Sequence, residues 1–225
     1  MKGYTILETD IITIKGGFKV NRFIHYVQQL GDLLIYFFKL HINAILHILL
    51  GGVLLGIFPS LTSLIEILHD CFETKTYVPL HFGDRWRRHF IISNTIGWIL
   101  SPICLFILFE LYLSIQFVRL SALNLFLCMV LIVMISVLLW SLVSQARYQL
   151  LSLQHIKQGF FLLLASLFDT LTIGLATLFA VVICILFPFA LLFLGMPLLI
   201  LPLAWFSYKS TRRIENRNLL NRTKQ

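Results

Sequence analysis

Charged residues are scarce in this chain, and their scarcity excludes most soluble folds. Asp, Glu, Lys and Arg together make up 12% of its 225 residues, whereas hydrophobic residues make up 59%. Soluble domains carry roughly 25% charged residues, so half that supply leaves too little charge to cover a folded chain in water. The mean hydropathy is +0.90. We therefore expect an integral membrane protein.

Long runs without charge indicate where the chain crosses the membrane. Residues 120–143 contain no charged residue, and residues 159–207 contain one, Asp169. A membrane-spanning helix needs about 20 mostly apolar residues, so the first run accounts for one span and the second for two. The whole pattern predicts an all-α membrane bundle with five spans, near residues 33–58, 90–116, 120–143, 159–187 and 189–207.

Three further segments complete the expected organisation. Residues 1–32 form an N-terminal tail with a short amphipathic lead-in, and residues 208–225 form a basic C-terminal tail. Near residues 60–73, apolar residues recur at the spacing of one helix face. This segment is too short to span, so we expect a cytoplasmic amphipathic helix along the inner membrane surface or beneath the bundle. The N-terminal tail lacks the compact apolar core of a cleaved signal peptide.

Cysteine is rare, and the common catalytic motifs are missing. The four cysteines are far apart in the sequence, so neither a disulfide framework nor a metal site is indicated. His69, Asp70, His81 and His89 lie in one region, but their spacing matches no metal template. Nucleophile-elbow, zinc-protease and P-loop motifs are also missing. We therefore predict that the protein is not an enzyme and has no cofactor, catalytic residue or metal.

The net charge of +8 belongs to the segments between the apolar runs. No basic stripe interleaved with aromatic residues accompanies it, so a nucleic-acid partner is not expected. The connections carry 5 Lys and Arg residues on one side of the membrane and 12 on the other. The richer side should be cytoplasmic, which places the C-terminus inside. A sixth, undetected membrane element would move the N-terminus to the inside as well.

The stretch GGVLLGIFPSLTS, residues 51–63, marks the end of the first span. Pro59 lacks an N–H and disfavours helix at the preceding residue, so this span is predicted to end at Phe58. Ser63 and Glu66 have the spacing of a capping box. The predicted structural seam consists of Gly52, Gly56, Phe58, Pro59, Ser60 and Thr62.

The same region resembles a known family. LGDLLIYFFKLHINAIL followed by GGVLLGIFPSLTSLIEILHD resembles the start of the YesL-like family, bacterial membrane proteins of unknown function. In that family, a span with a central Asn leads into a Gly-x-Phe-Pro-Ala-Thr-like turn. FGDRWRRHF is similar to the family's basic and aromatic entry to the second span. The matching positions of the first motif are Asn43, Gly56, Phe58, Pro59, Ser60 and Thr62.

The resemblance extends over residues 22–207 in layout and over residues 30–90 in motif. It implies a multi-span bacterial membrane protein associated with sugar-uptake systems, and it carries over no catalytic residue.

Polar residues in the predicted spans form a candidate intramembrane site. Lys39, Asn43 and His47 are spaced i, i+4 and i+8, which places them on one stripe of the first span. Asp169 lies ten positions after Gly159, a rise of roughly 15 Å, which places it near the bilayer middle at the depth of His47. The two side chains could pair. They would line a solute or proton path, or serve as polar contacts between packed helices.

At the start of the second span, Arg85, Trp86, Arg87 and Arg88 are predicted to form a cytoplasmic basic anchor, or a site for anionic lipid headgroups or a cytoplasmic partner. The expected function is that of a non-catalytic accessory or regulatory component of a membrane system, with the link to carbohydrate uptake implied by the resemblance. The alternative is a small-solute transporter or channel, and a third option is a lipid-active enzyme. Expected partners are membrane lipids and other membrane proteins such as a sugar-uptake system; the oligomeric state is open.

Overall fold

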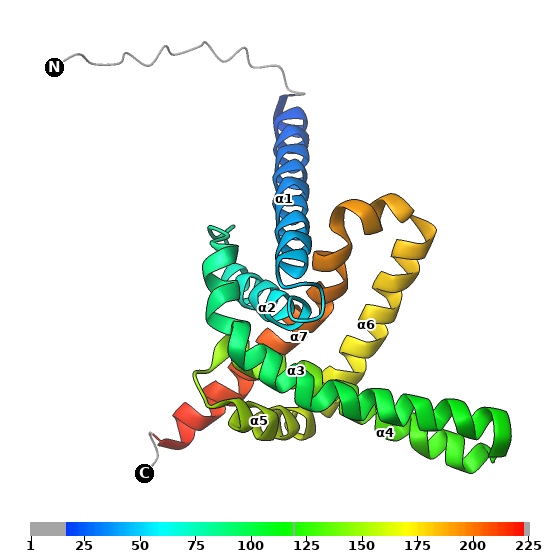
Figure 1. The fold of residues 1–225 in the computed structure, drawn as a ribbon. Coiled ribbons are helices and arrows are strands. Elements are labelled where there is room, and N and C mark those ends of the chain that lie inside the picture. Colours follow the sequence, from blue (N-terminus) through cyan, green and yellow to red (C-terminus); the bar gives the residue numbers. More distant parts are fainter. Residues whose placement is uncertain (1–16, 119, 223–225) are drawn as a thin grey trace. The chain divides into compact units, whose positions relative to one another are not determined.

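The computed structural model describes residues 17–118 and 120–222, and all regular structure in these residues is helical. This confirms the predicted all-α class. The predicted N-terminal tail and the end of the C-terminal tail lie partly outside the described residues. The elements are α1 (Gly17–Leu50), α2 (Ile57–Thr74), α3 (Phe82–Leu113), the π-helical turn η1 (Ser114–Val118), α4 (Ser121–Arg147), α5 (Ser152–Ala165), α6 (Leu167–Leu186) and α7 (Pro188–Arg222) (Figure 1).

The chain divides into two compact units, residues 1–36 and residues 37–225. The described part of the first unit is the beginning of α1, which exposes apolar side chains such as Val27, Leu30 and Ile35. The second unit contains the rest of α1 and all other helices, and the following description concerns this unit.

Five of the described helices are long and apolar enough to cross a membrane, which agrees with the predicted number of spans. They are Val27–Leu50, Phe82–Phe117, Ser121–Arg147, Leu167–Leu186 and Pro188–Arg217. The chain is thus a membrane-type, multi-pass helical protein. The third helix lies nearest to its predicted limits, whereas the first, second, fourth and fifth each begin or end several residues away from them.

The end of α1 is the first such difference. The helix stops at Leu50 rather than at Phe58, because Gly52 and the following residue both have φ of 65°, in the left-handed region where glycine is favoured. Pro59 instead lies in the first turn of α2. Backbone N–H groups in a first turn make no hydrogen bond within the helix, so the lack of an N–H in proline costs nothing there. The prediction that Pro59 ends the first span is therefore wrong, since the turn at Gly52 ends it.

Gly56 is required at this turn by a close backbone approach. A Cβ atom there would lie only 2.6 Å from the Cα of Ile48, so the glycine lets the turn fold back on the last turn of α1. Both Gly52, with its positive φ, and Gly56, with its close approach, therefore serve the turn.

The helix α2 is buried at the centre of the second unit. Leu64, Ile65, Ile67 and Leu68 are at most 1% exposed, and α2 packs against α3, α4 and α7. The structure thus favours packing beneath the bundle over a position along the membrane surface. The predicted capping box is wrong, because α2 already begins at Ile57 and the Ser63 hydroxyl donates to the Pro59 carbonyl oxygen at 2.7 Å.

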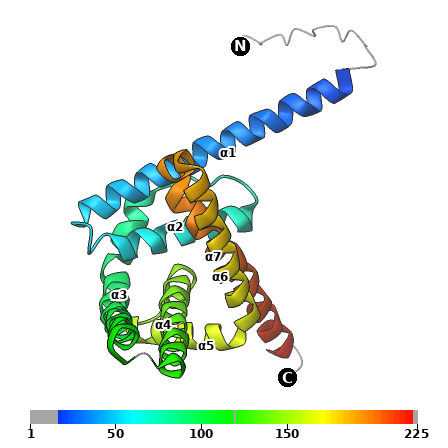
Figure 2. The ribbon, with the colours of Figure 1, turned by 90° about the vertical axis from the view of Figure 1, so that its right-hand side faces the viewer.

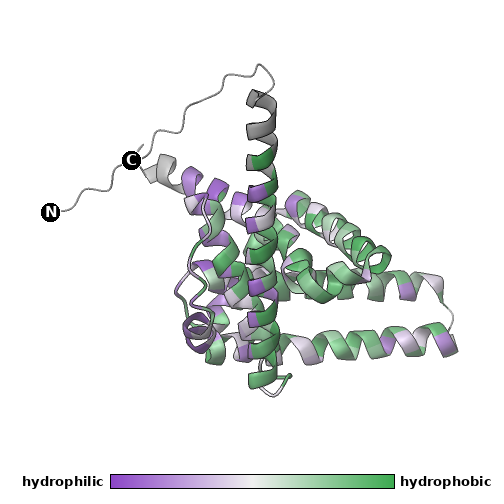
Figure 3. Ribbon diagram, turned by 90° about the horizontal axis from the view of Figure 1, so that it is seen from above, coloured by the Kyte–Doolittle hydropathy of each residue, from purple (hydrophilic) through white to green (hydrophobic). Residues whose placement is uncertain are grey.

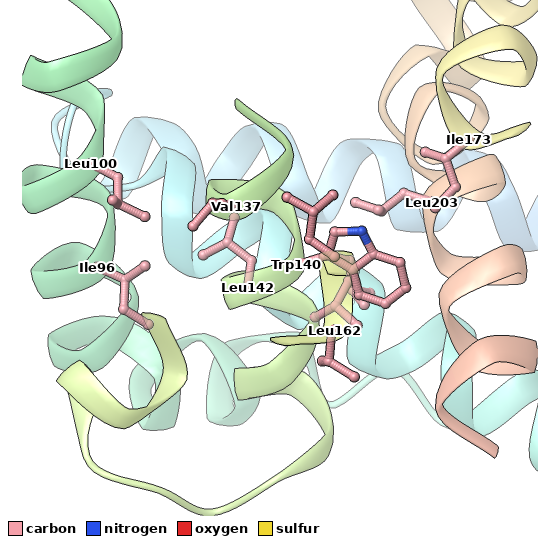
Figure 4. Close-up of a cluster of buried hydrophobic side chains, with 11 residues drawn as sticks. Ile96, Leu100, Val137, Trp140, Leu142, Leu162, Ile173 and Leu203 are labelled. Atoms are coloured by element: carbon pink, nitrogen blue, oxygen red, sulfur yellow. The ribbon is translucent and has the colours of Figure 1, made fainter. Parts of the chain in front are cut away.

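The hydrophobic core joins six helices, with Trp140 of α4 at its centre (Figure 4). Trp140 is 1% exposed, and its indole Nε1 donates to the Thr170 hydroxyl at 2.9 Å, which satisfies its polar atom. The buried members are Ile65, Ile96, Leu100, Val137, Trp140, Leu142, Val143, Leu162, Leu163, Ile173 and Leu203. Burial of these side chains fixes the ends of the spans that lie near α2.

Beyond this core, the helices form two antiparallel hairpins, α3 with α4 and α6 with α7 (Figures 1 and 2). Figure 3 shows that hydrophobic residues predominate along the α3–α4 hairpin. Leu105, Phe106, Phe126, Leu175 and Phe179 are each more than 60% exposed. Extended exposed apolar surface is unfavourable in water and marks contact with a membrane or partner, as expected for membrane spans.

Candidate functional site

Each residue of the polar stripe predicted on α1 has its own surroundings in the structure. Lys39 is exposed, and the Asn43 amide donates to the Lys39 carbonyl oxygen at 2.8 Å within the helix. His47 lies in the last turn of α1 and not halfway through a span. Its ring packs against Phe82 and Trp86, with centroid distances of 4.9 and 5.7 Å.

Asp169 lies at the end of a helix and not in the middle of a span. The predicted fourth span is interrupted, because α5 ends at Ala165 and α6 begins at Leu167. Asp169 therefore lies in the first turn of α6, where a negative side chain interacts favourably with the positive end of the helix dipole. Its Oδ2 atom lies 3.5 Å from Nη1 of Arg213, so Arg213 is its partner in place of the suggested His47.

The predicted basic anchor at the start of α3 engages carboxylates of α2. Nη1 of Arg85 lies 2.6 Å from Oδ2 of Asp70 and 3.2 Å from Oε1 of Glu66. Nη2 of Arg88 donates to the same Glu66 oxygen at 3.0 Å. Arg87 is exposed. Two of the three arginines thus connect α3 to α2, a role that the basic pattern alone did not indicate.

Glu66 is the centre of this polar cluster. Its side chain is 17% exposed and contacts three basic groups, of which His89 is the nearest, with Nε2 at 2.7 Å from Oε2. Burial by itself would raise the pKa of Glu66, but the hydrogen bond and charge of His89, together with Arg85 and Arg88, bring the pKa below its ordinary value. The carboxylate is therefore ionised at neutral pH.

A chain of hydrogen bonds leads from His89 into the protein. Nε2 of Gln145 lies 3.4 Å from Nδ1 of His89, and Oε1 of Gln145 accepts a hydrogen bond from the Ser93 hydroxyl at 2.8 Å. Ser93 in turn lies 3.0 Å from the Thr62 hydroxyl. Nε2 of Gln145 also donates to the His89 backbone carbonyl oxygen at 3.3 Å, so Gln145 holds the His89 ring with its Nε2 atom facing Glu66.

A second group of charged residues connects α4 to α7. Nε and Nη2 of Arg147 donate to the two carboxylate oxygens of Glu215, each at 2.8 Å. The Tyr148 hydroxyl donates to Oε1 of Glu215 at 2.9 Å. Burial, and then the bond to Glu215, raise the pKa of Tyr148 to about 12. Two parallel bonds between guanidinium and carboxylate are the strong form of this pair.

Two buried histidines lie beside these groups. His69 is 3% exposed, and its Nε2 lies 3.0 Å from the Ser207 hydroxyl. Its Nδ1 has no hydrogen-bond partner in the described structure. Burial, assisted by the charge of Arg147, lowers the pKa of His69 to about 4. His155, whose Nδ1 lies 3.0 Å from the Ser144 hydroxyl, also has a pKa lowered by burial.

Acid should destabilise the protein through His69. The unfolded chain binds a proton at this residue near pH 6.5 and the folded chain only near pH 4, so stability should fall as the pH decreases through this window. The full difference corresponds to about 3 kcal/mol. Thermal unfolding in detergent between about pH 7.5 and pH 4.5 measures this effect, and His69→Gln should flatten the profile. His81→Gln, at an exposed position, should not; equal slopes for both variants would contradict the assignment.

The cluster borders a pocket of about 370 Å³ at the connection between α4 and α5. Glu66 and Arg88 line one part of it, and residues 145–150 line another. The complete lining is Glu66, Arg88, His89, Ile92, Gln145, Ala146, Arg147, Tyr148, Gln149, Leu150 and His155. No group of His, Cys, Asp and Glu side chains in the described residues is arranged to hold a metal ion.

This cluster was not predicted from the sequence, although a signal for it is present. Glu66 and Asp70 are spaced i and i+4 on α2, and Arg85, Arg88 and His89 are spaced i, i+3 and i+4 on α3. Each set therefore shares one helix face, and two consecutive helices with faces of opposite charge are expected to pair. The partners contributed by α4 and α7 have no such local signal.

Comparison with known proteins links part of this site to a family. Residues 37–111, which are 75 of the 225 residues, match the model of a family described as "Protein of unknown function, DUF624". The match covers one third of the chain. It includes α2 and the Glu66–Arg85 ion pair but not α4 to α7. Neither the curated proteins nor the solved structures contain a match. The YesL-like name stays a prediction from the sequence motifs.

Proposed function

We propose that the protein is a non-catalytic accessory or regulatory component of a membrane system. One observation carries this proposal: the paired charges of the second unit gather where α2 meets the ends of the spans, as with Glu66 and Arg85 or Arg147 and Glu215. These groups bind one another and hold helices together. Such an arrangement suits a membrane scaffold that presents one polar end to other components.

The membrane system and the orientation are further parts of the proposal. The resemblance of residues 30–90 to YesL-like proteins supports a sugar-uptake system as the partner. The excess of Lys and Arg on the side of the C-terminus supports a cytoplasmic position of the cluster, because Glu215 belongs to the C-terminal part of α7. Membrane lipids would surround the exposed apolar hairpins.

The alternative, a solute transporter with a polar path along the first and fourth spans, has less support. Such a path needs polar groups at successive depths of the bilayer. His47 stands in the last turn of α1 and Asp169 in the first turn of α6, so both lie at helix ends. Each also has a local partner, the Phe82 ring for His47 and the Arg213 guanidinium for Asp169.

Two measurements on sugar uptake test the proposal. Deletion of the gene should slow uptake of at least one labelled sugar by intact cells, because an accessory component supports a separate transporter. The double variant Asp169→Asn with His47→Gln should restore uptake as well as the unaltered protein, since neither residue lies on a path. Purified protein in liposomes should carry no sugar.

Either of two results would contradict the accessory role. One is saturable sugar flux in liposomes that contain this protein alone. The other is failure of the double variant to restore uptake although it reaches the membrane in normal amount, which would favour the transporter.

A further inference from the structure

We propose that the pocket at the α4–α5 connection binds a phosphate ester, with Arg88 as its principal ligand. This inference rests on the pocket and not on the accessory role proposed above. A volume of about 370 Å³ falls within the range of small-molecule sites, so the pocket is large enough for a phosphate group with a short polyol.

Two side-chain acceptors that line the pocket, the Glu66 carboxylate and the Gln145 amide oxygen, are already occupied. Oε1 of Glu66 receives bonds or close contacts from Arg85 and Arg88, and Oε2 pairs with His89. Oε1 of Gln145 accepts from the Ser93 hydroxyl. A ligand that donates hydrogen bonds would therefore find these side-chain oxygens already paired.

Hydrogen-bond donors, in contrast, are left over. The Arg88 side chain is 64% exposed and makes a single bond, from Nη2 to Glu66, whereas a guanidinium carries five N–H donors. The backbone N–H groups of Gln149 and Leu150 lie in the non-helical connection, and they have no partner among the described residues. The charged side chain of the pocket with most of its hydrogen-bond donors unused is thus Arg88, and its positive charge favours an anion.

Among anions, a phosphate ester fits this set best. Its oxygens accept several hydrogen bonds at once, and the planar fork of arginine matches them geometrically. Nearby positive charge also favours an anionic ligand. The exposed Arg87 and Lys157 belong to α3 and α5, the helices on either side of the pocket. The ester would be either a soluble phosphorylated compound or the headgroup of an anionic lipid, since the pocket lies near the ends of membrane spans.

Calorimetric titration of the full-length protein in non-ionic detergent tests the proposal in two arms. Glycerol 3-phosphate is the soluble probe, and dihexanoyl phosphatidylglycerol in mixed micelles is the lipid probe. Dihexanoylglycerol, which has the same chains without phosphate, is the control for the second arm. Saturable binding in the first arm assigns a soluble ester, and saturable binding in the second arm alone assigns a lipid headgroup.

The variants Arg88→Gln and Arg87→Gln form a matched pair that removes the same charge from adjacent positions. Arg88→Gln should weaken binding at least about tenfold, as expected for a charge-assisted hydrogen bond, whereas Arg87→Gln should weaken it less than about twofold through distant charge alone. Arg85 and His89 still hold Glu66 in the Arg88 variant, so the fold should persist. Equal losses in the two variants would overturn the proposal.

A second variant tests the pocket without a change in charge. Gln149 is exposed and lies in the connection at the pocket, so Gln149→Trp should fill the site and abolish binding while the protein stays folded. Full affinity in the folded Gln149→Trp variant would overturn the proposal, as would the lack of saturable binding in both arms or equal binding of dihexanoylglycerol.

Discussion

Glu215→Gln is expected to lower the free energy of unfolding by about 3 kcal/mol, since it removes the charge opposite Arg147. The guanidinium of Arg147 is only 15% exposed, and both of its bonds at 2.8 Å go to Glu215. Without this carboxylate, the largely buried charge keeps weaker contacts among the described residues, the Glu73 carboxylate at 3.7 Å and the Tyr208 ring at 5.7 Å. Breaking such a pair typically costs about 3–5 kcal/mol, and we expect the lower end because the Glu215 side chain is 32% exposed.

Glu73→Gln is the matched control, because it removes the same charge near the same arginine. Glu73 is 53% exposed, and its Oε2 lies 3.7 Å from Nη1 of Arg147. Exposed ion pairs contribute about 0–1 kcal/mol, so this variant should unfold almost like the unaltered protein. Denaturant unfolding in detergent, followed by tryptophan fluorescence, compares the two. Equal losses of stability in the two variants would show that the loss of a negative charge near Arg147, and not the loss of its two paired hydrogen bonds, destabilises the protein.

The simultaneous replacement of both partners distinguishes a lost bond from an unpaired charge. In Arg147→Met with Glu215→Leu, no charge is left without its partner, and apolar pairs of similar volume are often as stable as buried ion pairs. We therefore expect this double variant to be more stable than Glu215→Gln alone. A double variant less stable than the single one would contradict this explanation.

Gly159→Ala should cost about 2–3 kcal/mol, because α5 crosses α4 at this glycine without room for a side chain. A Cβ atom would lie 2.7 Å from the backbone nitrogen of Ser141 and 3.0 Å from its Cα. Backbone atoms cannot rotate away as a flexible side chain can, so the two helices would have to separate. Small residues at helix contacts permit this kind of close approach.

Gly174→Ala is the matched control for this variant. Gly174 lies within α6, and a Cβ atom there would meet nothing within 4 Å. Because alanine stabilises a helix by about 1 kcal/mol relative to glycine, this change should leave the free energy of unfolding unaltered or raise it slightly. Thermal unfolding in detergent measures both variants. If Gly159→Ala is as stable as Gly174→Ala, the two helices are not in the close contact described here.

The limits of the spans show where sequence patterns fail. Residues 159–187 form one apolar run in composition, but the helices break at Ser166, whose hydroxyl forms a hydrogen bond with that of Ser210 on α7. A bond to a residue so distant in the chain leaves no mark in the local hydropathy. The same break moved Asp169 from the predicted bilayer middle to the first turn of α6.

The segment after α1 contains two local signals that can end a helix, a proline and a pair of glycines. Pro59 and the Gly51–Gly52 pair both disfavour a continuous helix, and Pro59 was expected to end the first span. Gly52 adopts φ of 65°, and Pro59 fits the first turn of α2. Glycine ended the helix because the close contact of Gly56 with the last turn of α1 stabilises the turn at that position.

Composition by itself determined that this is a helical membrane protein with five spans, because the apolar content of a segment sets its preference for lipid whatever its neighbours are. Helical spacing also puts Glu66 with Asp70, and Arg85 with His89, on shared faces, although this signal was not used to predict the cluster. Only the tertiary structure decided which groups meet across helices, as with Gln145 and His89 or Arg147 and Glu215. These partners lie 56 and 68 residues apart in the sequence, and charge pairing acts through distance in space, which no local pattern records.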